Sequence, residues 1–154
     1  MNDIIKNWKE TDSVSMSCSI LEKGGVIVYP TDTIYGLGCD ATNEYAIKKI
    51  NLIKRRQTPI SVMAPSKTNI YNWLNVKKKH KNKISKKVFS SDTYILPIKD
   101  NIVSKLILGD DKSLGIRKPN HQFCNKLSEN YPNPITTTSV NRTGEPPLKD
   151  PGLI

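Results

Sequence analysis

Short runs of aliphatic and β-branched residues alternate along this chain with segments whose apolar residues have helical spacing, and this alternation constrains the fold more than any other feature. The apolar run 26–29 is too short for a helix and is typical of a buried strand. The segment that begins at Asn43 instead places Ala46, Ile50 and Ile53 on one helical face. Repetition of this pattern predicts an α/β or α+β domain in which helices flank a mixed β-sheet.

The predicted strands are residues 26–29, 60–63, 93–98, 113–117 and 135–138. The predicted helices are residues 13–23, the segment from 43 to the basic triplet at 54–56, 68–74, 101–108 and 121–130, with the lysine-rich stretch 77–87 as a further candidate. Residues 30–40 have no regular period, and we predict a structured loop there.

Length and cysteine usage place the chain in a broad class. Its 154 residues fit one domain with a core of its own. Cys18, Cys39 and Cys124 are isolated, so we expect no disulfide framework, no metal site and a reducing, cytoplasmic setting. The first ten residues do not resemble a signal peptide, and no apolar run reaches the ~18 residues of a spanning helix, so we expect no membrane association.

The charge of the chain is strongly basic. Lys and Arg number 24 against 14 Asp and Glu, which gives a formal net charge of +10. Residues 77–87 alone hold seven lysines and one histidine. This balance favours anionic partners such as nucleotides, phosphates or RNA, although a lysine run can also be a solvated surface. Both interpretations stay open for this run.

The loop at 29–41, with the sequence YPTDTIYGLGCDA, combines hydroxyl groups with glycines. Asp32 can cap or orient the hydroxyls, and Gly36 and Gly38 allow the backbone to approach a ligand closely. Such a loop can hold a small polar molecule, or it can be a rigid turn with Asp32 as its cap. The hydroxyl residues are Thr31, Thr33 and Tyr35.

Two further pairs of polar residues are spaced two apart. Lys54 and Arg56 would diverge on a continuing helix, but they would share one side if the chain became extended after Lys54, and two cations then suit a polyphosphate. Ser139 and Asn141 follow a predicted strand and can both face one ligand in extended geometry. The alternatives are an ordinary basic helix end and a polar turn. The sequence has no Walker A motif, kinase glycine loop or GxGxxG, so ATP would need another binding mode.

Taken together, four segments in this order resemble the YrdC-like family. They are YPTDTIYGLGCDA at 29–41, Ile53–Arg56 followed by the strand at 59–62, Leu114–His121 and Thr138–Gly144. The resemblance implies a twisted α/β domain with a positively charged concave face. It also implies a threonylcarbamoyl-AMP synthase, which uses L-threonine, bicarbonate and ATP, usually with Mg²⁺, and releases pyrophosphate. A transferase complex then passes the threonylcarbamoyl group to tRNA.

The resemblance also assigns residues to this reaction. Lys54 and Arg56 are expected to be catalytic and, with Ser139 and Asn141, to bind ATP. Arg117 is a further candidate for phosphate. The residues expected to bind threonine are Thr33, Arg55 and Thr93, and no protein ligands to a metal are expected.

The sequence departs from the family pattern in places. The turn before Thr93 reads Ser90-Ser91-Asp92, without the usual proline and glycine, and the chain ends at Ile154, where relatives continue. We therefore expect an N-terminal extension at 1–12 and a C-terminally short YrdC-like domain at 13–154. Two other functions stay open: a module that binds tRNA or double-stranded RNA without turnover, and a carbamoyl-transfer domain like those of hydrogenase-maturation proteins.

Overall fold

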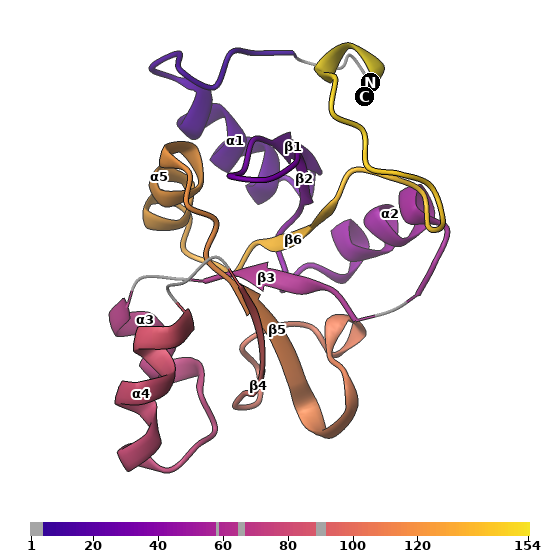
Figure 1. Ribbon diagram of the computed structural model, residues 1–154. Helices are drawn as coiled ribbons and strands as arrows, with labels where there is room; N and C mark the ends of the chain where they lie inside the picture. The colour runs from indigo at the N-terminus through magenta and orange to yellow at the C-terminus, as the bar shows by residue number, and fades with distance from the viewer. Residues whose placement is uncertain (1–4, 58, 65–66, 89–91) are drawn as a thin grey trace.

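A strongly twisted six-stranded β-sheet organises the computed structural model, which describes residues 5–57, 59–64, 67–88 and 92–154 (Figure 1). The strands are β1 (Ile27–Tyr29), β2 (Gly36–Gly38), β3 (Ser61–Met63), β4 (Thr93–Pro97), β5 (Ser113–Arg117) and β6 (Thr136–Ser139). The helices are α1 (Ser13–Glu22), α2 (Glu44–Lys54), α3 (Lys67–Trp73), α4 (Lys78–Val88) and α5 (Gln122–Asn130), with 3₁₀ turns at Lys105–Ile107, Asp110–Lys112 and Pro151–Leu153.

The order of the strands is β1-β2-β6-β3-β5-β4. Among the described strands β3 and β5 are parallel neighbours, whereas each other neighbouring pair is antiparallel. The predicted mixed sheet with flanking helices is therefore confirmed. Within the described ranges, no helix has both the length and the apolar character that a bilayer crossing needs.

Helices cover the two faces of the sheet unequally. On one face, α1 and α5 pack side by side over β1 and β2, with Leu21, Tyr29 and Leu127 buried between them (Figure 1). On the other face, α2 packs through Ile47 and Ile50, and α3 and α4 complete the core. The α1–α5 layer leaves part of β3, β5 and β4 open. The open residues include Ile95, which is 74% exposed, and the half-buried Ser61 and Gly115.

The structure corrects the prediction of a loop throughout residues 30–40. Gly36–Gly38 forms β2, which pairs with β1 on one side and β6 on the other. The glycines are needed because the Tyr29 ring lies across this strand. A Cβ added at Gly36 or Gly38 would meet ring atoms at 2.8 Å. The close neighbour of these glycines is thus an aromatic side chain of the core and not a ligand.

Two smaller predictions are also wrong. The helix expected at 101–108 is reduced to the 3₁₀ turn Lys105–Ile107, because Ser104 and Leu108, on either side of the turn, have extended backbone with ψ of 143° and 145°. On α2, Ile53 is 46% exposed and Lys54 takes the buried place. Lys54 follows Ile47 and Ile50 by seven and four residues, so these three share a face.

A methyl group at Gly38 is expected to destabilise the fold. In Gly38→Ala the new Cβ would lie 2.6 Å from the carbonyl oxygen of Thr136 and 2.8 Å from the Tyr29 ring. Backbone cannot yield cheaply, so we expect a loss of about 1–3 kcal/mol in unfolding free energy, measured by urea titration. Gly152→Ala is the control, because its Cβ would meet Asp150 at 3.4 Å. Equal stability of the two variants would contradict the packing described for β2.

Candidate functional site

The end of α2 and the end of β6 meet around the ammonium group of Lys54. This residue is 1% exposed. Its Nζ donates hydrogen bonds to the carbonyl oxygens of Ser139 (2.6 Å) and Asn141 (3.1 Å), and to Asn141 Oδ1 (3.0 Å). An ammonium group has three N–H donors, so each has a partner. Lys54 therefore ties together two segments that are 85 residues apart in sequence.

The backbone at the end of α2 explains why Lys54 can face inward. Arg55 adopts a left-handed conformation with φ 54° and ψ 41°, which ends the helix. The backbone N–H and the hydroxyl of Thr143 both donate to the Lys54 carbonyl oxygen, at 3.1 and 2.9 Å. The chain at 54–56 thus neither continues as a helix nor becomes a strand, which were the two geometries considered from the spacing of Lys54 and Arg56.

The turn after β6 is preformed by its own side chains. Asn141 Oδ1 accepts hydrogen bonds from Lys54 and from the Ser139 hydroxyl. Asn141 Nδ2 donates to the carbonyl oxygens of Arg142 (3.0 Å) and Glu145 (2.8 Å). These bonds hold the Ser139 and Asn141 side chains together in a polar turn and not in the extended backbone that their spacing also allowed.

This end of the site is electropositive. Burial, and next the charge of Arg56, lower the pKa of Lys54 from 10.5 to about 8, so the group is still charged at neutral pH. Arg56 is half-buried and Arg55 is exposed beside it. Across the part of the chain that the structure describes, no carboxylate forms an ion pair with these three cations. The arrangement suits an anion.

The buried charge of Lys54 predicts a pH dependence of stability. The unfolded chain keeps this proton up to about pH 10.5, but the folded chain loses it near pH 8. Between these values the unfolded state binds more protons, so the contribution of Lys54 to unfolding free energy rises with pH. We expect the unfolding free energy of wild type minus that of Lys54→Met, both measured by urea unfolding, to increase from about pH 8 to about pH 10. A flat difference would contradict the burial of a charged group.

A second cluster forms where the loop after β1 reaches the end of β5. The Thr31 hydroxyl accepts from the N–H groups of Thr33 (3.1 Å) and Ile34 (3.2 Å), which makes a compact turn. Arg117 Nη2 donates to Asp32 Oδ1 (3.0 Å) and to the Thr33 hydroxyl (3.2 Å). The ion pair with Asp32 therefore clamps the tip of this loop to the sheet.

Arg117 also has a position beside β4. Thr93 is its direct partner in the antiparallel register of β4 and β5, so Arg117 lies between Thr93 and Thr33. Its Nε is buried and has no hydrogen-bond partner within the described ranges. A buried N–H without an acceptor is costly, and a ligand carboxylate would satisfy it.

A row of small side chains connects the two clusters across the open face. Thr137 of β6 pairs with Ser61 of β3, and Gly115 of β5 lies against Ser61, where a Cβ would come within 2.4 Å of Ser61 Oγ. Ser139 lies at one end of this floor and Arg117 at the other. At ~3.4 Å per residue and ~4.8 Å per strand, their separation is about 16 Å.

The predicted residues thus form two groups. Lys54, Arg56, Ser139 and Asn141 lie together at the first cluster, and Thr33, Thr93 and Arg117 at the second. Arg55 lies at the end of α2, and no described hydrogen bond or ion pair joins it to either threonine. Sequence reasoning missed Thr143 as the cap of α2, and Ser61 as part of the floor. The available signal for Ser61 was the β-branched residue on either side of it in the sequence, which predicts a strand with Ser61 on its opposite face.

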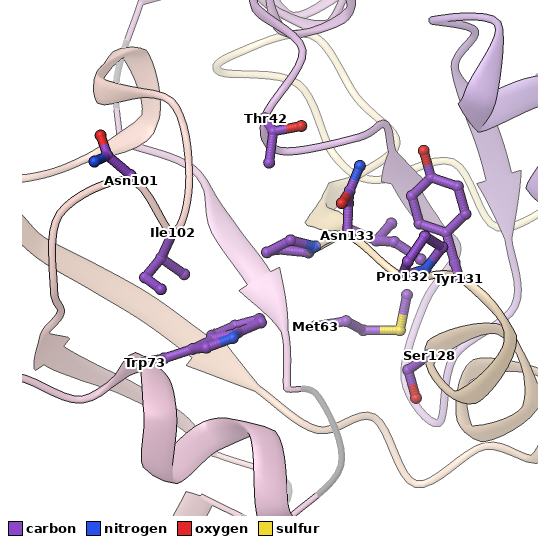
Figure 2. Close-up of a pocket in the computed structure, with 11 residues that line it drawn as sticks. Thr42, Met63, Trp73, Asn101, Ile102, Ser128, Tyr131, Pro132 and Asn133 are labelled. Atoms are coloured by element: carbon purple, nitrogen blue, oxygen red, sulfur yellow. The ribbon is translucent and has the colours of Figure 1, made fainter.

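A separate pocket of about 200 Å³ is lined by Thr42, Met63, Trp73, Asn101, Ile102, Ser128, Tyr131, Pro132, Asn133, Pro134 and Ile135. Figure 2 shows Trp73 and Ile102 on one side of it and Tyr131 on the other. Its polar groups serve the fold, because Asp40 accepts hydrogen bonds from Tyr131 (2.8 Å) and Asn133 (2.7 Å). None of the predicted site residues lines this pocket.

Comparison with known proteins agrees with the architecture and the motifs. A profile of the Sua5/YciO/YrdC family, described as telomere recombination, matches residues 19–154. A threonylcarbamoyl-AMP synthase of Photobacterium profundum is 32% identical over 143 residues, which cover 90% of this chain and 77% of that protein. A synthase of Saccharophagus degradans is 29% identical over 143 residues, covering 91% and 74%.

Solved structures have the same fold. YciO of E. coli superposes with a TM-score of 0.79 at 25% identity, covering 94% of this chain and 71% of that one. Sua5 of P. abyssi, complexed with L-threonine, has a TM-score of 0.77 at 26% identity. The match covers 94% of this chain but 42% of the Sua5 chain, so this chain spans less than half the length of Sua5. Because the family profile covers most of its residues, the chain belongs to the Sua5/YciO/YrdC family.

Proposed function

We propose that this chain is an L-threonylcarbamoyladenylate synthase, a nucleotidyltransferase that makes threonylcarbamoyl-AMP and pyrophosphate from L-threonine, bicarbonate and ATP. The observation that carries this proposal is the convergence of Lys54, Ser139 and Asn141, which come from two distant motifs, on one preformed electropositive turn. Curated relatives that bear this enzyme's name align with nine-tenths of the chain. The L-threonine in the Sua5 structure supports the same substrate.

The reaction proceeds in two steps. The amine of L-threonine attacks the carbon of bicarbonate, a C–N bond forms and water leaves, which gives a carbamate. A carbamate oxygen then attacks the α-phosphorus of ATP, and the bond to the bridging oxygen breaks to release pyrophosphate. Phosphoryl chemistry of this kind needs positioning and charge stabilisation more than covalent help from the protein.

The electropositive cluster would bind the nucleotide. All three donors of Lys54 are engaged by the Ser139–Asn141 turn. We therefore assign Lys54 to holding this turn in place and giving it positive charge, so that it contributes to catalysis indirectly, through the turn. Arg56 supplies the guanidinium that neutralises charge on the transferring phosphates. Arg55, expected at threonine from the resemblance, lies next to Arg56, and we assign it to the phosphates as well.

The second cluster would bind L-threonine. Arg117, expected at phosphate, contacts Thr33 and lies beside Thr93, the two residues expected at threonine. Its buried Nε donor favours the amino-acid carboxylate as the acceptor. The floor of about 16 Å between Ser139 and Arg117 then leaves room for an extended substrate, with the carbamate and α-phosphate meeting over Ser61 and Thr137.

The remaining assignments concern the surroundings of this reaction. We propose that Mg²⁺ enters with ATP as its counterion, because this ion is usually bound largely through the phosphates of the substrate. We propose a cytoplasmic reaction, where ATP is supplied, whose product goes to a transferase complex that modifies tRNA. We assign residues 1–12 to an extension and 13–154 to the catalytic domain, since α1 begins at Ser13.

Pyrophosphate release is the test of this function. We expect release from ATP only when L-threonine and bicarbonate are both present, with D-threonine as the inactive control. A well-folded chain that binds RNA but releases no pyrophosphate would favour the binding module. Release that requires carbamoyl phosphate in place of bicarbonate would favour the carbamoyl-transfer domain.

A further inference from the structure

The positive charge of this chain is unevenly distributed along its sequence. No Asp or Glu occurs between Glu44 and Asp92, whereas 13 of the 24 Lys and Arg residues lie in that stretch. The rest of the chain holds all 14 acidic residues and is slightly negative. Five of these 13 cations belong to α2 and its end, at 48–56, but seven are the lysines at 77–87. A charged surface chosen only for solubility would not gather so many cations on one short helix, which points to a cationic face on α4.

The helix α4 turns its apolar residues inward and its lysines outward. Val88 is fully buried and Ile84 packs against the same core. Lys81 Nζ donates to the carbonyl oxygen of Tyr71 (2.9 Å), which fixes the helix to α3. The exposed residues are Lys77, Lys78, Lys79, His80, Asn82, Lys83, Lys86 and Lys87.

The exposed lysines form a stripe with a repeat that suits a phosphate backbone. Lys79, Lys83 and Lys86 follow each other by four and three residues, so they lie along one side of the helix over about 10 Å. Like charges at this spacing repel each other and cost helix stability. A polyanion laid along the stripe would relieve that repulsion and release its counterions.

The composition of this face selects among polyanions. It exposes no apolar side chain among the residues described, so it lacks what an amphipathic helix inserts into a membrane. Among its described residues His80 is the one exposed ring on which an unpaired base could stack, whereas the lysines are many, which favours the folded, double-helical backbone. The helix lies apart from the end of α2 and the end of β6, so its lysines are separate from the cluster proposed to bind the nucleotide (Figure 1).

We propose that the exposed lysine stripe of α4 binds the phosphate backbone of folded RNA. The choice of RNA rests on the proposed function, whose product is destined for a tRNA, while the charge and geometry of the stripe stand without it. Contacts are made by ammonium groups to phosphates, so binding depends on RNA shape and salt and only weakly on sequence.

The test compares two triple variants that remove equal charge. Lys79→Gln, Lys83→Gln and Lys86→Gln together neutralise the stripe, and Lys23→Gln, Lys105→Gln and Lys149→Gln together neutralise three exposed lysines elsewhere. We expect the first triple to weaken binding of an unmodified tRNA transcript at least 10-fold at low salt. It should also reduce the slope of log affinity against log salt by about 2–3, with less than a 3-fold effect of the second triple.

Three outcomes would overturn the proposal: no binding of tRNA by the wild-type chain at low salt, equal weakening by the two triples, or equally tight binding of anionic vesicles or polyglutamate. Pyrophosphate release from ATP, L-threonine and bicarbonate is measured in parallel without RNA. The stripe variant should retain it, because these lysines are outside the proposed catalytic site. Failure of turnover with intact tRNA binding would overturn the proposed function and leave the RNA surface standing.

Discussion

Lys54→Met is expected to reduce ATP-dependent turnover at least 100-fold and to lower the unfolding free energy by about 2–4 kcal/mol. The reason is that methionine fills the buried space but leaves the carbonyl oxygens of Ser139 and Asn141, and Asn141 Oδ1, without their donor. The turn after β6 then loses both its anchor and its charge. Initial rates of pyrophosphate release measure the first effect, and urea unfolding measures the second.

The control for this variant lies on the same helix. Lys48 is exposed on α2, so Lys48→Met removes one charge without disturbing the turn. We expect it to change stability by no more than about 0.5 kcal/mol and turnover by less than 3-fold. A Lys54→Met protein that unfolds at the wild-type urea concentration and turns over normally would show that the buried ammonium group has no part in the site.

Arg117→Lys is expected to raise the KM for L-threonine about 10- to 100-fold while the KM for ATP changes little. Lysine keeps the positive charge, but its single ammonium group cannot both take the place of Nη2, which donates to Asp32 and Thr33, and replace the buried Nε donor. The loop after β1 would lose the ion pair that holds it to the sheet. The carboxylate of L-threonine would lose the donor proposed to bind it. Steady-state kinetics with each substrate varied in turn separate the two effects.

Arg142→Lys is the matched control, because it makes the same chemical change at an exposed arginine in the turn after β6. We expect it to leave the KM for L-threonine within 3-fold of wild type. If Arg117→Lys instead raised the KM for ATP and left that for L-threonine unchanged, Arg117 would belong to the phosphate end, as the resemblance to the family first suggested.

Sequence patterns predicted the fold well wherever a segment had a clear period. The apolar run of β1, the alternation of β5 and the helical spacing of α2 each identified the correct element. The strand β2 has no such period, because its glycines are required by the ring of Tyr29, which packs over them in the folded chain. Local propensity carries no information about that contact.

The candidate site was only partly predictable for the same reason. The spacing of Ser139 and Asn141 indicated that both could face one ligand, and the structure brings their side chains into contact within a turn. The inward position of Lys54 depends on the left-handed Arg55 and on the cap from Thr143, and neither has a local signature in a basic triplet. The clamp of Arg117 on Asp32 joins residues 85 apart, so only the folded chain brings them together.

Mass spectrometry of the reaction product tests the central claim most directly. The wild-type chain is incubated with ATP, Mg²⁺, L-threonine and either ordinary or ¹³C-labelled bicarbonate. The proposed function predicts threonylcarbamoyl-AMP, heavier by one mass unit with the labelled substrate, and none when L-threonine is left out. A folded chain that binds ATP and L-threonine but forms no labelled adenylate would contradict it.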